Sequence, residues 1–200
     1  MRMTLVLLPW LALAACAGSD GSSDDPNDPN PSDSTDGSDD TDVIPEVYNP
    51  VLINFDELSA DIDVSTEYAD SVTFSATDDS ALYAWDYARY ARSGSYTAYT
   101  ARSGGGAGVS SDLTWTFTDP VRNLMFYSLG DQRSGVIASI DITYDGGQTA
   151  TVDMITDGAA AEADLHDLSD YARVTEITIR DMVDPNTVNY DDISFEQLER

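Results

Sequence analysis

Two adjacent aspartates near the end of the chain, Asp191 and Asp192, are the residues whose chemistry most needs an explanation. They interrupt the apolar run "VNYDDISF" at residues 188–195. Neighbouring carboxylates repel each other unless a cation or hydrogen-bond donors lie beside them. In a strand, Asp191 shares a face with Ile193 and Phe195, which predicts that it points to the core while Asp192 points to solvent. A carboxylate on the core side needs a bound cation or good hydrogen bonds.

A second acidic pair, Asp56 and Glu57, directly follows the first apolar run of the globular part, "VLINF" at residues 51–55. The first and last strands of a sandwich often lie side by side, so we expect the two acidic pairs to meet at one rim. Ca²⁺ takes six to eight oxygen ligands from carboxylates and carbonyls, which such a rim supplies. We therefore predict a structural calcium site with Asp191 and Asp56 or Glu57 as ligands. The alternative is that these acids only cap the ends of strands.

Aromatic and basic side chains are concentrated in "ALYAWDYARYARSGSYTAYTAR" at residues 81–102. A strand would place Tyr83, Trp85 and Tyr87 on one face, whereas a helix would align Tyr83, Tyr87 and Tyr90; the β-rich surroundings favour the strand. Arginines grouped with aromatic rings can receive an anionic or hydroxyl-rich ligand. The alternative is packing at the core and rim, with the arginines neutralising nearby aspartates. The candidate ligand-binding residues are Tyr83, Trp85, Tyr87, Arg89 and Arg92, with Tyr90, Tyr96, Tyr99 and Arg102 beside them.

Catalytic machinery is difficult to assemble from this sequence. The single histidine, His166 in "DLHDLSD", has neither a second histidine nor a cysteine partner for a zinc site or a nucleophile–base pair. A surface or partly packed histidine is the simpler interpretation. The chain has 37 acidic residues, but no spacing singles out a pair for glycoside hydrolysis. We therefore expect that the protein is not an enzyme.

Alternation of apolar and polar residues after residue 45 predicts the strands that position these side chains. Asp145, Gly146 and Gly147 stand between two such runs and predict a hairpin. The segment 158–172 is the one candidate for a short helix, or else an extended loop. Many short strands at regular spacing predict an all-β fold, an antiparallel two-sheet β-sandwich of jelly-roll type. The predicted strands are 51–55, 71–76, 113–118, 123–129, 136–144, 149–155, 174–180 and 188–195.

The first sixteen residues, "MRMTLVLLPWLALAAC", have the pattern of an export signal. The apolar run 3–15 is too short to span a bilayer and has the length of a signal-peptide core. Leu13, Ala14, Ala15 and Cys16 resemble the lipobox of bacterial lipoproteins, in which the cysteine is acylated and the preceding peptide is removed. Several acyl chains, palmitate among them, are enough for stable anchoring. The alternative is an ordinary secretory signal with an incidental cysteine.

Residues 17–45 are almost wholly Asp, Ser, Gly, Pro, Asn and Thr, a composition that cannot bury apolar surface. We predict a signal peptide at 1–15, a lipidated Cys16 with a disordered acidic linker at 16–45, and one domain at 46–200. The net charge is −28, and all nine basic residues are arginine. This charge excludes binding to nucleic acid or to an anionic membrane surface. It fits a saline habitat or a protein that binds divalent cations.

Three segments of the chain together resemble one family: "INFDELSADIDVSTEYADSVTFSA", "PVRNLMFYSLGDQRSGVIASIDITYDGG" and "VTEITIRDMVDPNTVNYDDISF". They are similar to the galactose-binding-like jelly rolls, akin to carbohydrate-binding modules, of secreted, lipoprotein and PEP-CTERM-type bacterial proteins. In that family an acid of the first strand and an aspartate that opens the last strand share a structural calcium, and loop carbonyls complete its shell. The resemblance therefore implies Ca²⁺ as cofactor, with Asp56 and Asp191 at the matching positions.

The sequence as a whole leads us to expect a membrane-anchored lipoprotein of the bacterial cell envelope, at the outer membrane or cell surface. Its module would be non-catalytic, stabilised by calcium, and would bind glycans or mediate adhesion. The expected partners are the membrane, through the lipid anchor, and a polysaccharide or glycoprotein. The alternative is a purely structural surface lipoprotein without a small-molecule ligand, and a glycoside-active enzyme comes third.

Overall fold

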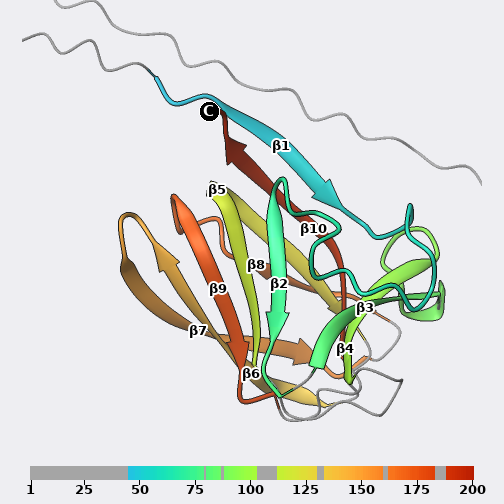
Figure 1. Cartoon of the computed structure of the whole chain (residues 1–200). Coiled ribbons are helices and arrows are strands. Elements are labelled where there is room, and N and C mark those ends of the chain that lie inside the picture. The colour runs from blue at the N-terminus through green and yellow to red at the C-terminus, as the bar shows by residue number, and fades with distance from the viewer. Residues whose placement is uncertain are drawn as a thin grey trace, which may run out of the picture. The chain divides into compact units, whose positions relative to one another are not determined.

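Ten antiparallel strands and a 3₁₀ helix build the part of the chain that the computed structural model describes (Figure 1). The described residues are 45–78, 80–86, 88–102, 112–129, 133–159, 162–182 and 188–200. Residues 1–44, with the predicted signal peptide, Cys16 and nearly all of the predicted linker, lie outside them. None of the described residues belongs to a helix long and apolar enough to cross a membrane.

The strands follow one another along a continuous ladder, β3-β4-β10-β5-β9-β6-β7, in which β1 also pairs with β10, and β2 and β8 pair with β5. The predicted all-β antiparallel sandwich is confirmed. The strands are β1 (Tyr48–Ile53), β2 (Val72–Ala76), β3 (Ser80–Asp86), β4 (Tyr96–Arg102), β5 (Leu113–Leu129), β6 (Ser134–Tyr144), β7 (Gln148–Asp157), β8 (Asp164–Asp167), β9 (Val174–Arg180) and β10 (Asn189–Leu198), and the 3₁₀ helix η1 is Ala88–Tyr90.

Strand β5 takes part in both layers of the sandwich. Its first part pairs with β2 and β9, and its second part pairs with β8 and β10. The rings of Trp115 in the first part and Phe126 in the second part lie 4.9 Å apart, so the two parts face each other across the core. Trp115 also packs edge-on against Tyr190 of β10. All three rings are fully buried, and they form the centre of the core.

The predicted strands 113–118 and 123–129 are therefore one strand of 17 residues, and the predicted break between them was wrong. The chain bends there without leaving the sheet. The register shifts between Thr116 and Val121, and Asn123 has a φ of 53°. Pro120, which has no N–H to donate, falls inside this shift, where it removes no ladder hydrogen bond.

The other sheet predictions have mixed outcomes. The β6–β7 hairpin forms at Asp145 and Gly146, both with positive φ, as predicted. Within the candidate helix 158–172, Asp164–Asp167 is strand β8, and none of the segment's described residues is helical. The aromatic segment forms strands β3 and β4, so its strand interpretation is confirmed for these residues, while Ala88–Tyr90 between them is the 3₁₀ helix η1.

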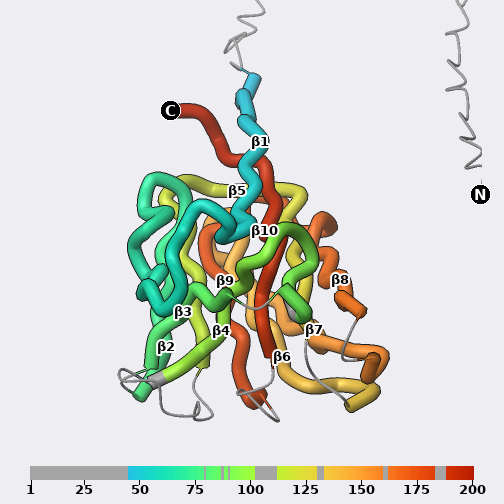
Figure 2. Tube along the Cα trace, turned by 90° about the vertical axis from the view of Figure 1, so that its right-hand side faces the viewer, coloured from blue at the N-terminus to red at the C-terminus, as the bar shows by residue number. Residues whose placement is uncertain are grey.

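Strands β3 and β4 lie to one side of β10 and β8 lies to the other (Figure 2). The sheet β2-β5-β9-β6-β7 shows why the sequence alternates. One cross-strand row is apolar and faces the core, and the next row is polar and faces outward. The apolar row is Phe74, Trp115, Ile177, Ile142 and Ala150, and a neighbouring polar row is Thr73, Thr116, Glu176, Thr143 and Thr149.

Candidate functional site

The pairing of β1 with β10 brings the two acidic pairs of the sequence to one end of the sandwich. Ile53 of β1 pairs with Ile193 of β10, as expected for neighbouring first and last strands. Asp56 follows the end of β1 by three residues, and Asp191 lies near the start of β10. Both carboxylates contact the segment 92–96, which joins η1 to β4.

Asp191 is fully buried, and both of its carboxylate oxygens accept hydrogen bonds from backbone amides. Oδ2 accepts from the N–H groups of Arg92 at 2.6 Å and Ser93 at 3.1 Å, and Oδ1 accepts from the N–H of Asp192 at 2.8 Å. Burial raises the pKa of Asp191 to about 6, although the three amide hydrogen bonds act in the opposite direction. The dipoles of these three backbone amides therefore hold the Asp191 carboxylate in place.

The burial of Asp191 agrees with its predicted strand parity, but the reason is different. Tyr190 packs on Trp115 in the core, and Ile193 is also fully buried, so the alternation changes phase between them. Asp192 has a φ of 44°, and the register with β5 shifts after Asp191. Asp191 is covered by the backbone of residues 92–93. Asp192, predicted to point to solvent, is half-buried and accepts a 2.6 Å hydrogen bond from the hydroxyl of Ser93.

Asp56 holds the other end of the same segment. Its Oδ1 accepts hydrogen bonds from the N–H groups of Ser95 at 2.9 Å and Tyr96 at 3.1 Å. Gly94 lies between these contacts with a φ of +59°, and a Cβ there would be 1.7 Å from Asp56 Oδ2. We call Asp56, Asp191 and the backbone of residues 92–96 the amide clamp.

The third predicted calcium ligand, Glu57, is not part of the amide clamp. Its side chain is exposed, and its Oε1 accepts a 2.9 Å hydrogen bond from the hydroxyl of Tyr68. Burial, followed by this hydrogen bond and the charge of Glu57, raises the pKa of Tyr68. Asp56 and Asp191 therefore meet the same loop, and Glu57 points to a different neighbour.

The donor set of the amide clamp, as arranged, does not fit a calcium ion. Ca²⁺ needs six to eight oxygens, whereas the loop presents N–H groups that occupy two lone-pair positions of Asp191 and two of Asp56. The N–H of Asp192 occupies a third position of Asp191. Within the described part of the chain, no three His, Cys, Asp or Glu side chains converge as a metal site would require. Calcium binding at this corner stays a prediction.

The aromatic face, which we define as Tyr83, Trp85 and Tyr99, lies on the outward side of β3 and β4. Tyr83 pairs with Tyr99, and the rings of Trp85 and Tyr99 are 5.2 Å apart. All three side chains are half-buried, while Leu82 and Ala84, which alternate with them, are fully buried. Burial and the charge of nearby Asp61 raise the pKa of Tyr99.

The remaining residues of the predicted ligand site have separate positions. Arg92 is exposed, and its guanidinium lies 4.9 Å from the centre of the Tyr127 ring. Arg89 is exposed in η1. Tyr87 lies outside the described residues, as do the side chains of Tyr90 and Arg102. Sequence reasoning missed Asp61, because it precedes β3 in a segment without a strand pattern, although its N–H donates to the carbonyl of Ala84 at 2.8 Å.

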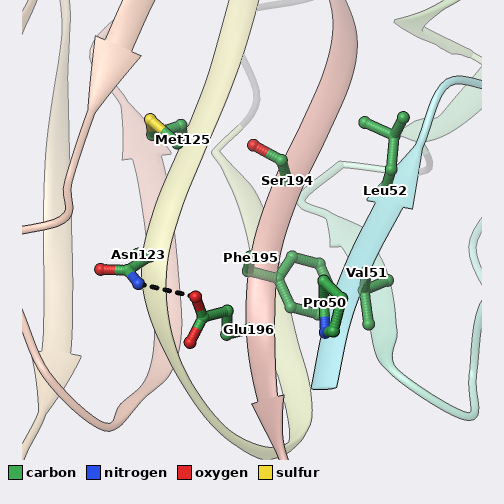
Figure 3. A pocket seen from close by; sticks show the side chains of 8 residues that line it. All are labelled: Pro50, Val51, Leu52, Asn123, Met125, Ser194, Phe195 and Glu196. Carbon is green, nitrogen blue, oxygen red and sulfur yellow. Dashed lines mark hydrogen bonds between the residues drawn. The ribbon is translucent and has the colours of Figure 1, made fainter. Parts of the chain in front are cut away.

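A groove of about 370 Å³ lies between β1, β10 and β5 (Figure 3). Its walls are mostly apolar, and Leu52 on its edge is 61% exposed. Its polar groups already bind each other, because Glu196 accepts hydrogen bonds from Asn123 at 3.0 Å and from Arg122 at 2.7 Å. The groove therefore offers few free groups to a polar ligand. The lining residues are Pro50, Val51, Leu52, Asn123, Met125, Ser194, Phe195 and Glu196.

Comparison with known proteins finds solved structures that this chain resembles, among them the following two. One is the enzymatically active domain of bacteriophage CBA120 tailspike protein 4, with a TM-score of 0.40 and 14% identity over 70% of this chain. The match spans 21% of that tailspike chain. The other is the carbohydrate-binding module TmCBM61, solved with β-1,4-galactotriose, with a TM-score of 0.34 and 16% identity over 72% of this chain and 99% of the module. No family profile and no curated protein matches the chain.

Proposed function

We propose that this protein is a non-catalytic glycan-binding or adhesion module held at the bacterial cell envelope. The observation that carries this proposal is the aromatic face, in which Tyr83, Trp85 and Tyr99 are neither sealed in the core nor scattered over the surface. Half-buried rings on a rigid sheet offer apolar area at a low entropic cost, because their side chains are already ordered.

The chemistry of the aromatic face suits a sugar ring. One side of a pyranose is covered by C–H groups, which pack on Trp or Tyr rings, while its hydroxyls need hydrogen-bond partners. Asp61 is near enough to Tyr99 to raise its pKa, and its carboxylate can accept from such hydroxyls. The chain's net charge of −28 opposes polyanions. These features favour a neutral polysaccharide, or the neutral glycans of a glycoprotein, as partner.

The location of this module is also part of the proposal. Acylation of Cys16 at the end of the signal peptide would anchor the chain in a membrane, at the outer membrane or cell surface. The acidic residues 17–45, which carry nine Asp and no basic residue, would extend by self-repulsion and hold the module away from the lipid. A module at that distance from the membrane can reach glycans of the envelope or of a neighbouring cell.

Binding of the full chain to a panel of immobilised polysaccharides and neutral oligosaccharides, β-1,4-galactotriose among them, tests the proposal. We expect affinity for at least one neutral glycan, and a loss of about tenfold in the variant Trp85→Ala, because a ring stack is removed. Tyr48→Ala is the matched control, since Tyr48 is a half-buried aromatic on β1 that contacts Arg122 instead. Absence of binding to every class of glycan would leave a structural surface protein as the better description.

A further inference from the structure

A second hollow, of about 310 Å³, opens between β7 and β8 and contains no residue of the aromatic face or the amide clamp. Its volume is at the lower end of the range for small-molecule sites, roughly 300–1,000 Å³. Side chains from β6, β7, β8 and the turn after β8 line it. Because β7 and β8 belong to opposite layers, the hollow lies where the sandwich is open at its side.

The buried polar group of this hollow is His166, the only histidine of the chain. Its side chain is 7% exposed, its Nε2 lies 2.7 Å from the hydroxyl of Ser128, and its ring packs at 4.9 Å on Phe126. Burial lowers the pKa of His166 to about 4, so the ring is neutral near pH 7. A neutral imidazole fixed by a hydroxyl and an aromatic ring has one orientation.

The second ring nitrogen of His166, Nδ1, makes no hydrogen bond to any described residue. The hollow is the space that the His166 side chain lines. A buried imidazole, held by Ser128 and Phe126, therefore borders a space large enough for a ligand, and its ring can hydrogen-bond to a hydroxyl there.

The walls of the hollow combine apolar surface with acceptors. Ile155 on β7 is 56% exposed and Leu165 on β8 is 49% exposed, so both offer apolar area to a ligand. Asp153, Asp167 and Asp170 lie among the lining residues. Asp167 stays ionised because hydrogen bonds from Ser169 lower its pKa. No basic side chain is among the described residues that line the hollow, so its aspartates would repel an anionic ligand.

We propose that the hollow between β7 and β8 is a subsite for one neutral pyranose unit, whose hydroxyl binds Nδ1 of His166. Ile155 and Leu165 contact the C–H face of the ring, and the aspartates accept from its other hydroxyls. This inference rests on the proposed glycan binding. It adds a site beside β8, which pairs with the edge of β5 opposite to the edge that pairs with β10. The sequence predicts only a surface or partly packed histidine at position 166. It does not reveal the hydrogen bond with Ser128, because that residue is 38 positions away.

Nuclear magnetic resonance of the ¹⁵N-histidine-labelled full chain in detergent tests the inference. Since there is one histidine, both ring nitrogen signals belong to His166. Their different couplings to the two carbon-bound ring protons distinguish Nδ1 from Nε2. The probes are cellotriose, maltotriose, mannotriose and the best-binding neutral glycan of the panel, with trigalacturonic acid as the anionic probe. We expect a saturable shift of Nδ1 with at least one neutral probe and none with the anionic one.

Two alanine variants make the assignment specific. Leu165→Ala should weaken the Nδ1 titration about fivefold, because the ring loses apolar contact. Leu52→Ala, which removes another exposed leucine from the groove between β1 and β10, should leave the titration unchanged. Neither leucine is in the core, so both variants should fold.

The outcomes separate this inference from the proposed function. If glycans bind and Trp85→Ala weakens that binding, but the His166 signals do not move, the subsite is refuted and the aromatic face remains the binding site. If Nδ1 shifts, and Leu165→Ala weakens the titration while Leu52→Ala does not, the subsite is supported. This holds whatever the effect of Trp85→Ala. If no probe and no polysaccharide binds, both proposals fail.

Discussion

Asp191 is a residue whose surroundings explain the two adjacent aspartates of the sequence. Three backbone N–H groups donate hydrogen bonds to its carboxylate, and the hydroxyl of Ser93 donates one to Asp192. A buried carboxylate with several donors can remain in place without a metal, at the cost of a raised pKa. The amide clamp therefore provides the hydrogen bonds that the sequence pattern requires.

Replacement of Asp191 by Ala removes the acceptor of three backbone amides. We expect the variant to lose about 2 kcal/mol of unfolding free energy, because buried N–H groups without a partner are costly. Asp192→Ala, which loses one hydroxyl partner and is half-buried, should lose less. Thermal melting of the full chain and both variants measures the difference.

The same melts with and without EDTA test the calcium prediction. If the carboxylates hold the loop through amides alone, the chelator should change the melting temperature of neither the wild type nor Asp191→Ala. A chelator effect on the wild type that disappears in Asp191→Ala would show that calcium occupies this corner. A bound ion at a hundredfold excess over Kd would contribute roughly 2.7 kcal/mol, which is easily measured.

Two buried groups give opposite pH dependences in overlapping ranges. The pKa of His166 falls from 6.5 to about 4 on folding, so the unfolded chain binds more protons and stability decreases as pH falls through this range. The pKa of Asp191 rises from 3.8 to about 6, so the folded chain binds more protons and stability increases as pH falls from 6 to 3.8. In the wild type the two effects oppose each other.

Variants of these residues should separate the two effects. Asp191→Asn leaves the histidine contribution, so its stability should fall relative to wild type between pH 6 and 4. His166→Gln keeps an acceptor for Ser128 and leaves the aspartate contribution, so its stability should rise over the same range. Urea unfolding at several pH values gives the slopes, and the histidine effect alone corresponds to about 3 kcal/mol. Parallel curves for the wild type and both variants would contradict the prediction.

At the scale of elements, the regular alternation of apolar and polar residues predicts strands correctly, whereas interruptions of that alternation were misinterpreted. The β6–β7 hairpin, the pairing of β1 with β10 and the aromatic strands β3 and β4 follow from period-two patterns and a Gly-rich turn. The long β5 was divided in the prediction because Asp119 and Pro120 are typical of a turn. Only the register shift between Thr116 and Val121 shows that the sheet tolerates them.

Short elements and backbone donors also escaped sequence reasoning. The four residues of β8 carry Leu165 and, just beyond the strand, Leu168, a spacing of three that suits a helix better than a strand. Their structure is decided by pairing with β5, which is distant in sequence. Only the carboxylates of the amide clamp could be predicted from the sequence. Its donors are backbone N–H groups, which have no sequence signature. Gly94 was the one available signal, since a positive φ and close approach both favour glycine.

Gly94→Ala tests whether the loop 92–96 needs this glycine. The new Cβ would overlap the Asp56 carboxylate and would also require an unfavourable positive φ. We expect a loss of about 2 kcal/mol or more, measured by urea unfolding, together with faster amide exchange at Ser95 and Tyr96. Gly146→Ala is the matched control, because Gly146 also has a positive φ (+76°) but nothing lies within 4 Å of its Cβ position. Equal losses would mean that strain alone, and not the contact with Asp56, explains the glycine.

At the scale of the whole molecule, we propose that a lipid-anchored N-terminal segment precedes a β-sandwich that binds sugars. The folded unit Ile44–Arg200 contains the aromatic face, the amide clamp and the hollow of His166. Cys16 belongs to the part of the chain outside the described residues, so its role depends on the sequence alone. A single substitution there can separate the anchor from the fold, because no strand residue changes.

Cys16→Ser should release the protein from the membrane without altering its folded part. The serine hydroxyl cannot replace the thiol in acylation, and the apolar run 3–15 is too short to span a bilayer. We expect the wild type in the membrane fraction after a high-salt wash, and the variant in the periplasm or medium. High salt is the necessary control, because it removes proteins that are held only by surface charge. Labelling with a palmitate analogue should mark the wild type alone. Membrane association of the variant equal to that of the wild type would refute lipid anchoring through Cys16.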